Sequence, residues 1–449
     1  MKRRSFIQKT GIAGLGVALS PLACTKTKAL DTEFLILGGG LSGLYLAYLL
    51  EKEGRDYILL EGSDRIGGRM FTRKDINRDV GGKGIGDGYA EVMSLIEELN
   101  TEMIDITDYM NSPTAIYKDG VLHNTWDSKE PNPRMLQYIA FGKEKQLGAL
   151  DEWYKKPELD EVYSKVLKRN GLSEAELDLV NITANYNDVR ETSAINAYHS
   201  NAFRKYNTSK RVLNFKGGTA PFIESIAKRL KKPVLKNKMV TSIDDSGESV
   251  LVTCNDGTSY KSKKVVSTMP FSTLRDVKMN TSFNSNQEKA IQNLKYTKIT
   301  QIHLAHSEPF WEEDGSPAAM WTDTPLERVM NLSSHRDEKQ IACWVNGTGT
   351  TFFDAMSEKE VATYTIKKMN EIRPASTGKI EYLGMQNWGK YKYNKGAYAE
   401  FGVGQAAWFE DMIKPASNLH FAGEHTAHMS RGMEAAAESA KRVFFELIN

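Results

Sequence analysis

The clearest hydrophobic pattern lies near the start of the chain. An apolar run over residues 33–37 predicts a buried strand, and apolar residues spaced three and four apart over 44–53 predict a helix. A second apolar run over 57–60 predicts another strand. Strand, helix and strand in this order predict a β-α-β unit.

The rest of the chain changes pattern several times. Residues from about 130 to 210 show helical spacing with few strand signals, and strand signals return over 234–268. A mixed stretch follows from about 280 to 390, and an alanine-rich pattern predicts a long helix over 434–448. No internal repeat interrupts this order, so 449 residues predict two domains rather than a repeat array.

A glycine pattern joins the first strand to the first helix. In Gly38-x-Gly40-x-x-Gly43, the first glycine permits a tight turn, the second lets backbone approach a pyrophosphate, and the third allows close helix–strand packing. Leu41 and Ser42 open the helix, whose free N–H groups bind phosphate. The pattern therefore predicts a dinucleotide site.

An acidic residue closes the second strand of this unit. Glu61, followed by Gly62, stands where a carboxylate accepts hydrogen bonds from ribose hydroxyls. Residues 63–69, Ser-Asp-Arg-Ile-Gly-Gly-Arg, come next and resemble the second fingerprint of the flavin amine oxidase superfamily. The resemblance implies FAD rather than NAD, with the paired glycines and Arg69 at the FAD pyrophosphate.

Further segments extend the resemblance along residues 33–449. Residues 79–86 resemble the glycine-rich segment under the isoalloxazine, where Gly81 and Gly82 let backbone meet the ring. Lys83 is assigned to the cofactor, with a substrate carboxylate or solvent as alternatives. Residues 215–219 resemble the segment that re-enters the FAD domain, and Val240 falls where the family packs an apolar residue on adenine.

The C-terminal region resembles the last FAD motif of the superfamily. Residues 422–426 contain Gly423 and Glu424, and the resemblance implies that Glu424 holds a ribose or ribityl hydroxyl. Met433 begins the final helix, whose N-terminus would face the flavin N1–C2 edge. We expect His425 and His428 to be solvated loop residues, and no His or Cys cluster has metal-binding spacing.

The resemblance implies an α/β fold, in which a Rossmann-like FAD-binding domain is interleaved with an α+β substrate domain. Residues 1–31 are predicted to be a signal peptide and linker. Residues 32–110, 211–280 and 399–449 are assigned to the FAD-binding domain, and 111–210 and 281–398 to the substrate-binding domain.

A spaced aromatic pattern marks the predicted reaction site. Trp388, Tyr393, Gly396 and Tyr398 resemble the monoamine oxidase segment that faces the flavin. The resemblance implies that Tyr398 forms one wall of an aromatic cage, whose π-face orients an amine, with Trp388 nearby. Aromatic residues of a strand pair that pack in a core are the alternative interpretation.

Three positions depart from the family pattern. Ala397 stands where monoamine oxidases carry the cysteine that bonds the flavin, so we expect non-covalent FAD. Gly432 replaces the second cage aromatic, which implies room for a bulkier substrate. Gln301 stands where the family usually carries a lysine that holds a water near flavin N5 and is linked to reaction with oxygen. Lys298, three residues earlier, need not point the same way. The sequence therefore leaves open whether oxygen or another molecule accepts the electrons.

The resemblance implies oxidation of the C–N bond of a primary or secondary amine, with hydride transfer to flavin N5 giving an imine and, with oxygen, hydrogen peroxide. Gly84 replaces an arginine common in amino-acid oxidases, which disfavours a standard α-amino acid. An amine dehydrogenase reducing a cytochrome or quinone, a C–C desaturase-type flavoenzyme and a non-enzymatic flavin-binding protein are the alternatives.

The N-terminus predicts export. A segment rich in basic residues, 2–9, precedes an apolar run over 11–23, which is typical of a signal peptide. Arg3-Arg4 resembles the twin-arginine signal of bacteria. Cys24 after Leu-Ala resembles a lipidation site, although Pro21 stands where leucine is usual. We therefore expect a periplasmic or lipid-anchored protein, with an ordinary amphipathic tail as the alternative.

Net charge bears on nucleic acid as a possible partner, and cysteine content limits the number of disulfides. The formal net charge is +2 with interspersed signs, so nothing favours nucleic acid as a partner. After Cys24, only Cys254 and Cys343 remain, which permits at most one disulfide. No pattern predicts the oligomeric state.

Overall fold

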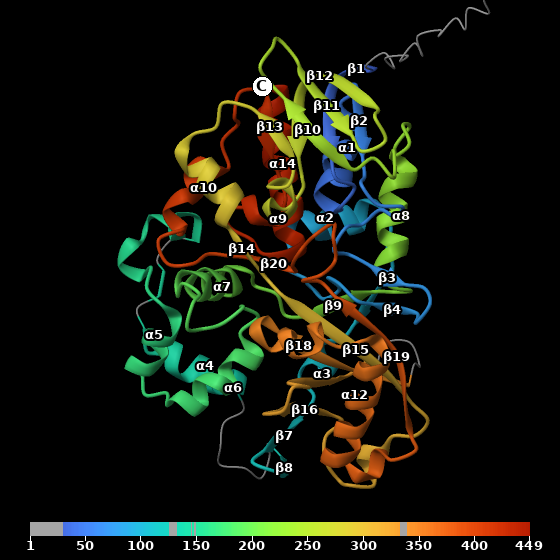
Figure 1. Ribbon diagram of the computed structural model, residues 1–449, viewed down its shortest axis with the longest axis vertical. Helices are drawn as coiled ribbons and strands as arrows, with labels where there is room; N and C mark the ends of the chain where they lie inside the picture. The colour runs from blue at the N-terminus through green and yellow to red at the C-terminus, as the bar shows by residue number, and fades with distance from the viewer. Residues whose placement is uncertain (1–29, 125–132, 145, 148–149, 333–338) are drawn as a thin grey trace, which may run out of the picture.

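The computed structural model describes residues 30–449, except for 125–132, 145, 148–149 and 333–338. Two seven-stranded sheets stand at opposite ends of the molecule, the first at the top of Figure 1 and the second at the bottom. The predicted signal peptide and Cys24 lie outside the described residues.

The first sheet contains the predicted β-α-β unit, which is confirmed. Strand β1 (Leu30–Leu37) lies between β12 and β2, parallel to both. The sheet gathers segments that lie far apart in the sequence. In spatial order its main path is β13 (Lys278–Asn280), β10 (Val240–Asp244), β11 (Val250–Cys254), β12 (Ser259–Ser267), β1 and β2 (Tyr57–Leu60), and β21 (Leu419–Phe421) pairs with β12.

Four helices bury their apolar faces in one core with this sheet. They are α1 (Leu41–Lys52), α2 (Ala90–Glu98), α8 (Thr219–Arg229) and α14 (Gly432–Ile448). Leu44, Leu46 and Leu50 of α1 are fully buried. Each such side chain stabilises the fold by about 1.5–3 kcal/mol. Helix α14 packs along α1, so the C-terminus holds the predicted phosphate-binding helix in place.

The second sheet is mostly antiparallel, and α12 (Glu358–Ile372) packs against it. Ile302, Leu304 and Cys343 are fully buried in its core. In spatial order its strands are β19 (Ile380–Asn387), β15 (Ile299–His306), β18 (Gln340–Asn346), β17 (Arg328–Asn331), β16 (Ala319–Thr322), β7 (Thr114–Lys118) and β8 (Val121–Asn124).

A helical region lies beside the second sheet, as the spacing over residues 130–210 predicts. Its α-helices are α4 (Pro133–Gly142), α5 (Tyr163–Arg169), α6 (Glu174–Thr183) and α7 (Ile195–Tyr206), which share a separate apolar core. In the described part of the chain, no helix has the length and apolar character needed to cross a bilayer.

Short strands lie between the two large sheets. The pair of β14 (Lys295–Thr297) and β20 (Tyr398–Glu400) carries Tyr398 to the middle of the molecule. The other short strands are β3 (Thr72–Arg73), β4 (Arg78–Asp79), β5 (Ile85–Gly86), β6 (Met103–Asp105) and β9 (Val212–Phe215). The short helices are α3 (Thr107–Met110), α9 (Phe271–Leu274), α10 (Ser285–Asn293), α11 (Thr350–Asp354) and α13 (Phe409–Met412).

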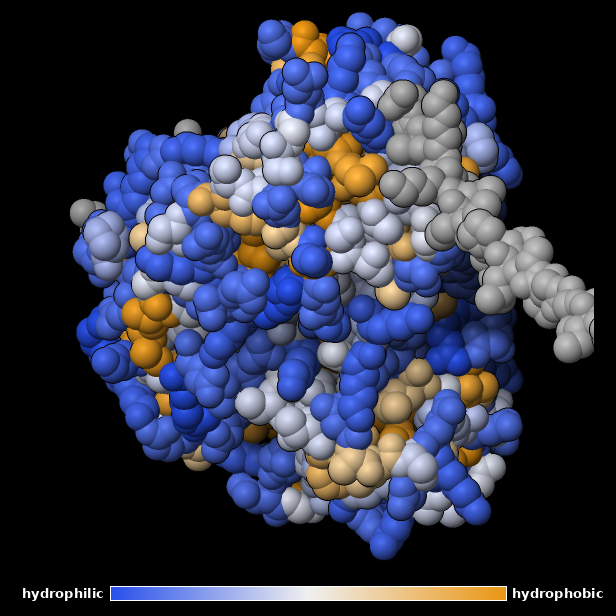
Figure 2. All heavy atoms as spheres, turned by 45° about the horizontal axis from the view of Figure 1, so that its top comes forward, coloured by the Kyte–Doolittle hydropathy of each residue, from blue (hydrophilic) through white to orange (hydrophobic). Residues whose placement is uncertain are grey.

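The predicted division into domains follows the segments that build the two sheets, although its boundaries stay a prediction. Cys254 lies in β11 and Cys343 in β18, and both are buried free thiols. The face of the molecule shown in Figure 2 is mostly hydrophilic, with hydrophobic side chains gathered in a few patches.

Candidate active site

One cavity joins the glycine turn of the first sheet to the predicted reaction site, where Gln301 of the second sheet meets Tyr398 of β20. Of the predicted site residues, Gly43 and Lys83 do not line it. The predicted residues that do are Gly38, Gly40, Leu41, Ser42, Glu61, Gly62, Arg69, Gly81, Gly82, Val240, Gln301, Trp388, Tyr398, Gly423, Glu424 and Met433. Their roles toward a cofactor stay predictions.

The turn before α1 depends on the absence of a side chain at Gly43. A Cβ there would lie 1.9 Å from the Gly38 carbonyl oxygen, so only glycine lets the helix start this close to the strand. Gly38 has a φ of 111°. The Thr268 hydroxyl donates to the carbonyls of Leu37 and Gly38 at 3.0 Å and holds the turn against the end of β12.

Glu61 is a buried carboxylate at the end of β2. One of its oxygens accepts the Gly39 N–H at 2.8 Å, and the other accepts the Ser63 N–H at 2.8 Å and the Ser63 hydroxyl at 2.7 Å. The side chain is only 8% exposed. These donors fix the carboxylate at the wall of the cavity, which Val240 also lines. There it could accept hydrogen bonds from the hydroxyls of a ribose.

Arg69 and Glu424 form an ion pair inside the cavity, which the sequence did not predict. One guanidinium nitrogen of Arg69 donates to Glu424 Oε1 and to the Ala397 carbonyl, both at 2.8 Å. The same Glu424 oxygen accepts the Ala399 N–H at 3.0 Å. The pair therefore ties three distant segments together beside the cavity.

The glycine-rich segment is held from both sides. Asp79 accepts from the Thr72 hydroxyl at 2.6 Å and from the Thr219 N–H at 3.0 Å, which anchors the start of the segment to α8. A Cβ on Gly81 would lie 1.8 Å from the Arg69 carbonyl oxygen, so this backbone contact requires glycine. Gly82 donates its N–H to the same oxygen at 3.0 Å.

Gln301 and Trp388 share one hydrogen-bond acceptor. Gln301 Nε2 donates to the Val80 carbonyl at 2.9 Å, and Trp388 Nε1 donates to it at 2.7 Å. Both side chains are nearly fully buried. They therefore position the backbone just before Gly81. Lys298 is exposed and does not line the cavity, so no lysine of this strand replaces Gln301 there.

Aromatic side chains surround the far end of the cavity. Tyr398 and Trp388 line it together with Trp344, which the sequence did not single out. Burial raises the pKa of the Tyr398 phenol, so the phenol stays neutral at ordinary pH. A Cβ on Gly432 would meet nothing within 4 Å, which leaves open space where the predicted second cage wall is missing.

The prediction that His425 is solvated is wrong. The side chain is 3% exposed, and its ring lies 4.5 Å from the Phe271 ring. Burial lowers the pKa of His425 to about 3, with Arg69 contributing, so the imidazole is neutral at any working pH. His425 therefore contributes no positive charge near the Arg69–Glu424 ion pair. His428 is half-buried against Phe409.

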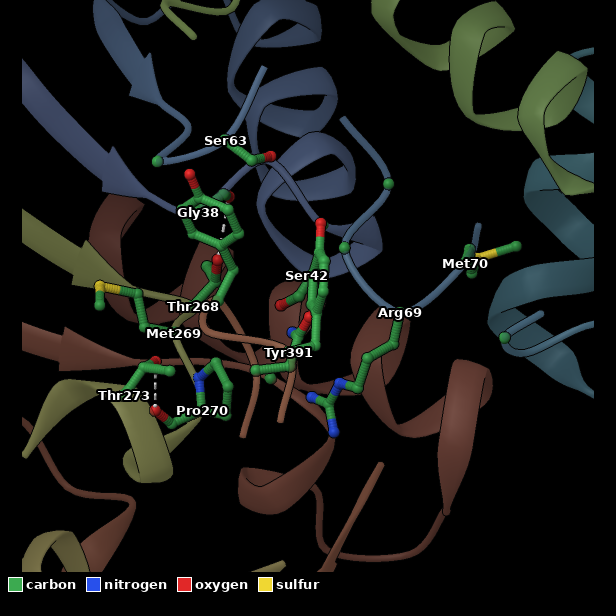
Figure 3. A pocket seen from close by; sticks show the side chains of 18 of the residues that line it. Gly38, Ser42, Ser63, Arg69, Met70, Thr268, Met269, Pro270, Thr273 and Tyr391 are labelled. Atoms are coloured by element: carbon green, nitrogen blue, oxygen red, sulfur yellow. Dashed lines mark hydrogen bonds between the residues drawn. The ribbon is translucent and has the colours of Figure 1, made fainter. Parts of the chain in front are cut away.

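Several lining residues were missed because they follow strands that carry no motif of their own. Figure 3 shows Thr268 and Pro270 after β12 and Tyr391 around one space, into which Arg69 also extends. Tyr391 lies two residues before Tyr393, which also lines the cavity. Attention to residues next to the aromatic pattern would have found it.

These features fit FAD. A glycine turn at a helix N-terminus, a buried carboxylate and apolar Val240 stand at one end, and two glycines that expose backbone stand at the other. Ala397 lines the cavity, whereas neither Cys254 nor Cys343 does, so the described residues offer no thiol for a covalent bond to the flavin.

Curated relatives match nearly the whole chain at low identity. A flavin-dependent L-tryptophan oxidase of Lentzea aerocolonigenes is 23% identical, with 91% of this chain and 96% of the relative covered. A flavin-containing amine oxidase A of Canis lupus familiaris is 24% identical, with 93% and 85% covered.

Solved structures share the fold. Putrescine oxidase bound to putrescine superposes with a TM-score of 0.77 at 18% identity, covering 94% of this chain and 99% of that one. Cyclohexylamine oxidase of Brevibacterium oxydans IH-35A gives 0.76 at 18% identity, covering 93% and 98%. The family described as flavin containing amine oxidoreductase matches residues 41–443. The chain therefore belongs to the flavin-containing amine oxidoreductases.

Proposed function

We propose that the protein binds FAD non-covalently and oxidises the C–N bond of a primary or secondary amine, with oxygen as acceptor and hydrogen peroxide as product. The observation that carries the proposal is the single cavity that runs from the glycine turn to Tyr398 and Trp388. Its first end suits a dinucleotide, and its second is an aromatic chamber that suits an amine.

The protein contributes position and exclusion of water. Tyr398 and Trp344 line the substrate end of the cavity. Gln301 and Trp388 hold the Val80 carbonyl, and the two glycines that follow it would face the flavin ring. Bound flavin supplies the two-electron acceptor for a hydride from the amine α-carbon, after which the imine hydrolyses in water. Orientation of the α-C–H bond is the main task of the chain.

No side chain is required to remove a proton from the carbon. His425 is neutral and faces Phe271, and the Tyr398 phenol is neutral. The amine reacts as the free base, so activity is expected to rise with pH until the substrate ammonium is deprotonated.

An amine dehydrogenase that reduces a cytochrome or quinone is the second candidate. The observation that favours it is Gln301, whose amide is engaged with the Val80 carbonyl where a lysine is usual. Turnover in air, compared with turnover after adding a soluble quinone or cytochrome c, separates the two. Peroxide formed in equimolar amount with product supports the oxidase, and turnover only with the added acceptor supports the dehydrogenase.

Non-covalent attachment has a direct test. Acid precipitation of the purified protein is expected to leave all of its flavin absorbance in the supernatant, because Ala397 offers no thiol at the cavity. Flavin that stays in the pellet contradicts this part of the proposal.

Replacing Arg69 by alanine is expected to weaken FAD retention about tenfold or more, because Glu424 loses its charged partner and Ala397 its donor. Equilibrium dialysis against FAD measures the change. Arg73→Ala is the matched control, because Arg73 also pairs with a carboxylate, Asp75, and donates to a backbone carbonyl, but does not line the cavity. Equal FAD loss in both variants contradicts the assignment.

The N-terminal segment exports the folded flavoprotein to the bacterial periplasm, where Cys24 anchors it if lipidated. The basic residues and the apolar run before Cys24 support this assignment. Cell fractionation and N-terminal sequencing test it. A cytoplasmic protein that retains residues 2–24 contradicts it.

A further inference from the structure

Four side chains form a row across the second sheet, which we call the Trp321–Gln301 row. Trp321 pairs with Arg328, Arg328 with Trp344, and Trp344 with Gln301, each on neighbouring antiparallel strands. Paired residues of antiparallel strands project from the same face of a sheet. Gln301 and Trp344 line the cavity, whereas Arg328 and Trp321 do not. Arg328 therefore stands on the cavity face of the sheet but behind the lining, one strand beyond Trp344.

Arg328 is stacked between two indole rings. Its guanidinium carbon lies 5.3 Å from the Trp321 ring centroid and 5.0 Å from the Trp344 ring centroid. Such stacking fixes the guanidinium plane and leaves its N–H groups to point along the plane, away from both rings. The side chain is therefore held in one orientation by contacts that use none of its donors.

Those donors have no partner within the part of the chain that the structure describes. No hydrogen bond or ion pair joins Arg328 to a described residue, and its Nε is buried without an acceptor. A half-buried arginine with unused donors is costly unless something accepts them. Unused donors of this kind are typical of an arginine that binds a ligand rather than one that only stabilises the fold.

The adjacent carboxyl group does not neutralise this charge. Glu327 accepts the Asn346 N–H at 2.7 Å, and burial raises the pKa of Glu327 to about 8, so it is mostly protonated at pH 7. Burial lowers the pKa of Arg328 only to about 10, which leaves the guanidinium charged. Arg328 thus carries an uncompensated positive charge at neutral pH.

A second arginine adds positive charge near Tyr398. Arg328 and Arg431 both act electrostatically on the Tyr398 phenol. Glu424 also does so, but it is already paired with Arg69. The guanidinium of Arg328, unpaired among the described residues, therefore lies directly behind Trp344 at the substrate end of the cavity.

We propose that Arg328 is the anion-binding residue of the substrate site and that the substrate is an amine carrying a carboxylate several bonds from the reacting C–N bond. This inference rests on the proposed function. Gln301 and Arg328 lie two strands apart, which is about 10 Å between their backbones. The same charge disfavours a diamine, whose second ammonium would meet Arg328.

Three probes of equal chain length test the proposal. Aminohexanoate, hexylamine and diaminohexane differ only in whether the far end is anionic, neutral or cationic. Rates of anaerobic flavin reduction at limiting substrate are expected to fall in that order. In Arg328→Gln, reduction by aminohexanoate should fall about 10- to 100-fold, whereas reduction by hexylamine should change less than threefold.

Two further variants separate charge from folding. Arg328→Lys keeps the charge but not the planar donors, so it should retain part of the preference for aminohexanoate. Arg204→Gln is the matched control, because Arg204 also stacks on an aromatic ring, Tyr138, at 4.6 Å, but lies on α7 outside the Trp321–Gln301 row. It should leave all three rates unchanged. Equal rates for aminohexanoate and hexylamine in the parent protein, or equal losses for both in Arg328→Gln, overturn the proposal.

A binding measurement keeps this inference distinct from amine oxidation itself. Hexanoate is not oxidised, yet it should perturb the flavin absorbance spectrum on binding, with a dissociation constant about tenfold or more weaker in Arg328→Gln. If no amine reduces the flavin while hexanoate binds through Arg328, the proposed function fails and the anion site stands. If amines reduce the flavin but hexanoate binds equally well to the parent protein and to Arg328→Gln, only the proposed anion site is contradicted.

Discussion

Replacing Glu61 by alanine is expected to weaken FAD binding roughly 10- to 100-fold. The substitution removes the predicted ribose contact and also the acceptor of the Gly39 and Ser63 N–H groups, so the loop beside the glycine turn loses its anchor. Equilibrium dialysis of the apoprotein with FAD, followed by flavin fluorescence, measures the change.

A second carboxylate on the same sheet provides the control. Glu33 lies in the middle of β1, pairs with Arg55 and does not line the cavity. Glu33→Ala is therefore expected to keep the affinity for FAD of the parent protein. If Glu61→Ala binds FAD as tightly as Glu33→Ala does, Glu61 has no part in the cofactor site.

Replacing Tyr398 by alanine is expected to slow flavin reduction by the best amine about 10- to 100-fold while FAD stays bound. The ring forms a wall of the substrate chamber, and without it the α-C–H bond is less well oriented. Tyr398 lies on β20 and pairs with Thr297, so the strand itself should survive the change. Anaerobic stopped-flow absorbance measures the reduction rate.

Tyr398→Phe separates the ring from the hydroxyl. The phenylalanine keeps the aromatic face, so the rate should stay within a few-fold of the parent rate. An alanine variant that is reduced at the parent rate contradicts the placement of Tyr398 at the reaction site.

The part of the cofactor site around the glycine turn was predictable because its contacts are local in sequence. The glycine turn before α1 and Glu61 after β2 belong to one short β-α-β unit, whose geometry follows from strand and helix spacing. Gly81 was predicted from the family resemblance, and the structure gives the physical reason, since its close backbone contact with Arg69 excludes any side chain.

The substrate half was less predictable because sheet register brings its residues together. Arg328 and Trp344 come from neighbouring strands, and Gln301 joins them only through the pairing of β15 with β18. The acceptor for Gln301 is the Val80 carbonyl, which lies far away in the sequence. No spacing rule along the chain predicts such contacts.

The burial of His425 shows a different limit. Its place in a glycine-containing loop favoured solvent, but Phe271 of α9 and the final helix enclose that loop. Tertiary packing therefore overrode the local signal.

The central claim is that glycine-rich segments from distant parts of the chain together bind one flavin. Its reactive edge would face the aromatic chamber lined by Trp344, Trp388 and Tyr398. The absorbance spectrum of the purified protein, recorded before and after anaerobic addition of an amine, tests it most directly. We expect a yellow protein whose flavin band bleaches when the amine is added. A colourless protein that takes up no FAD contradicts the claim.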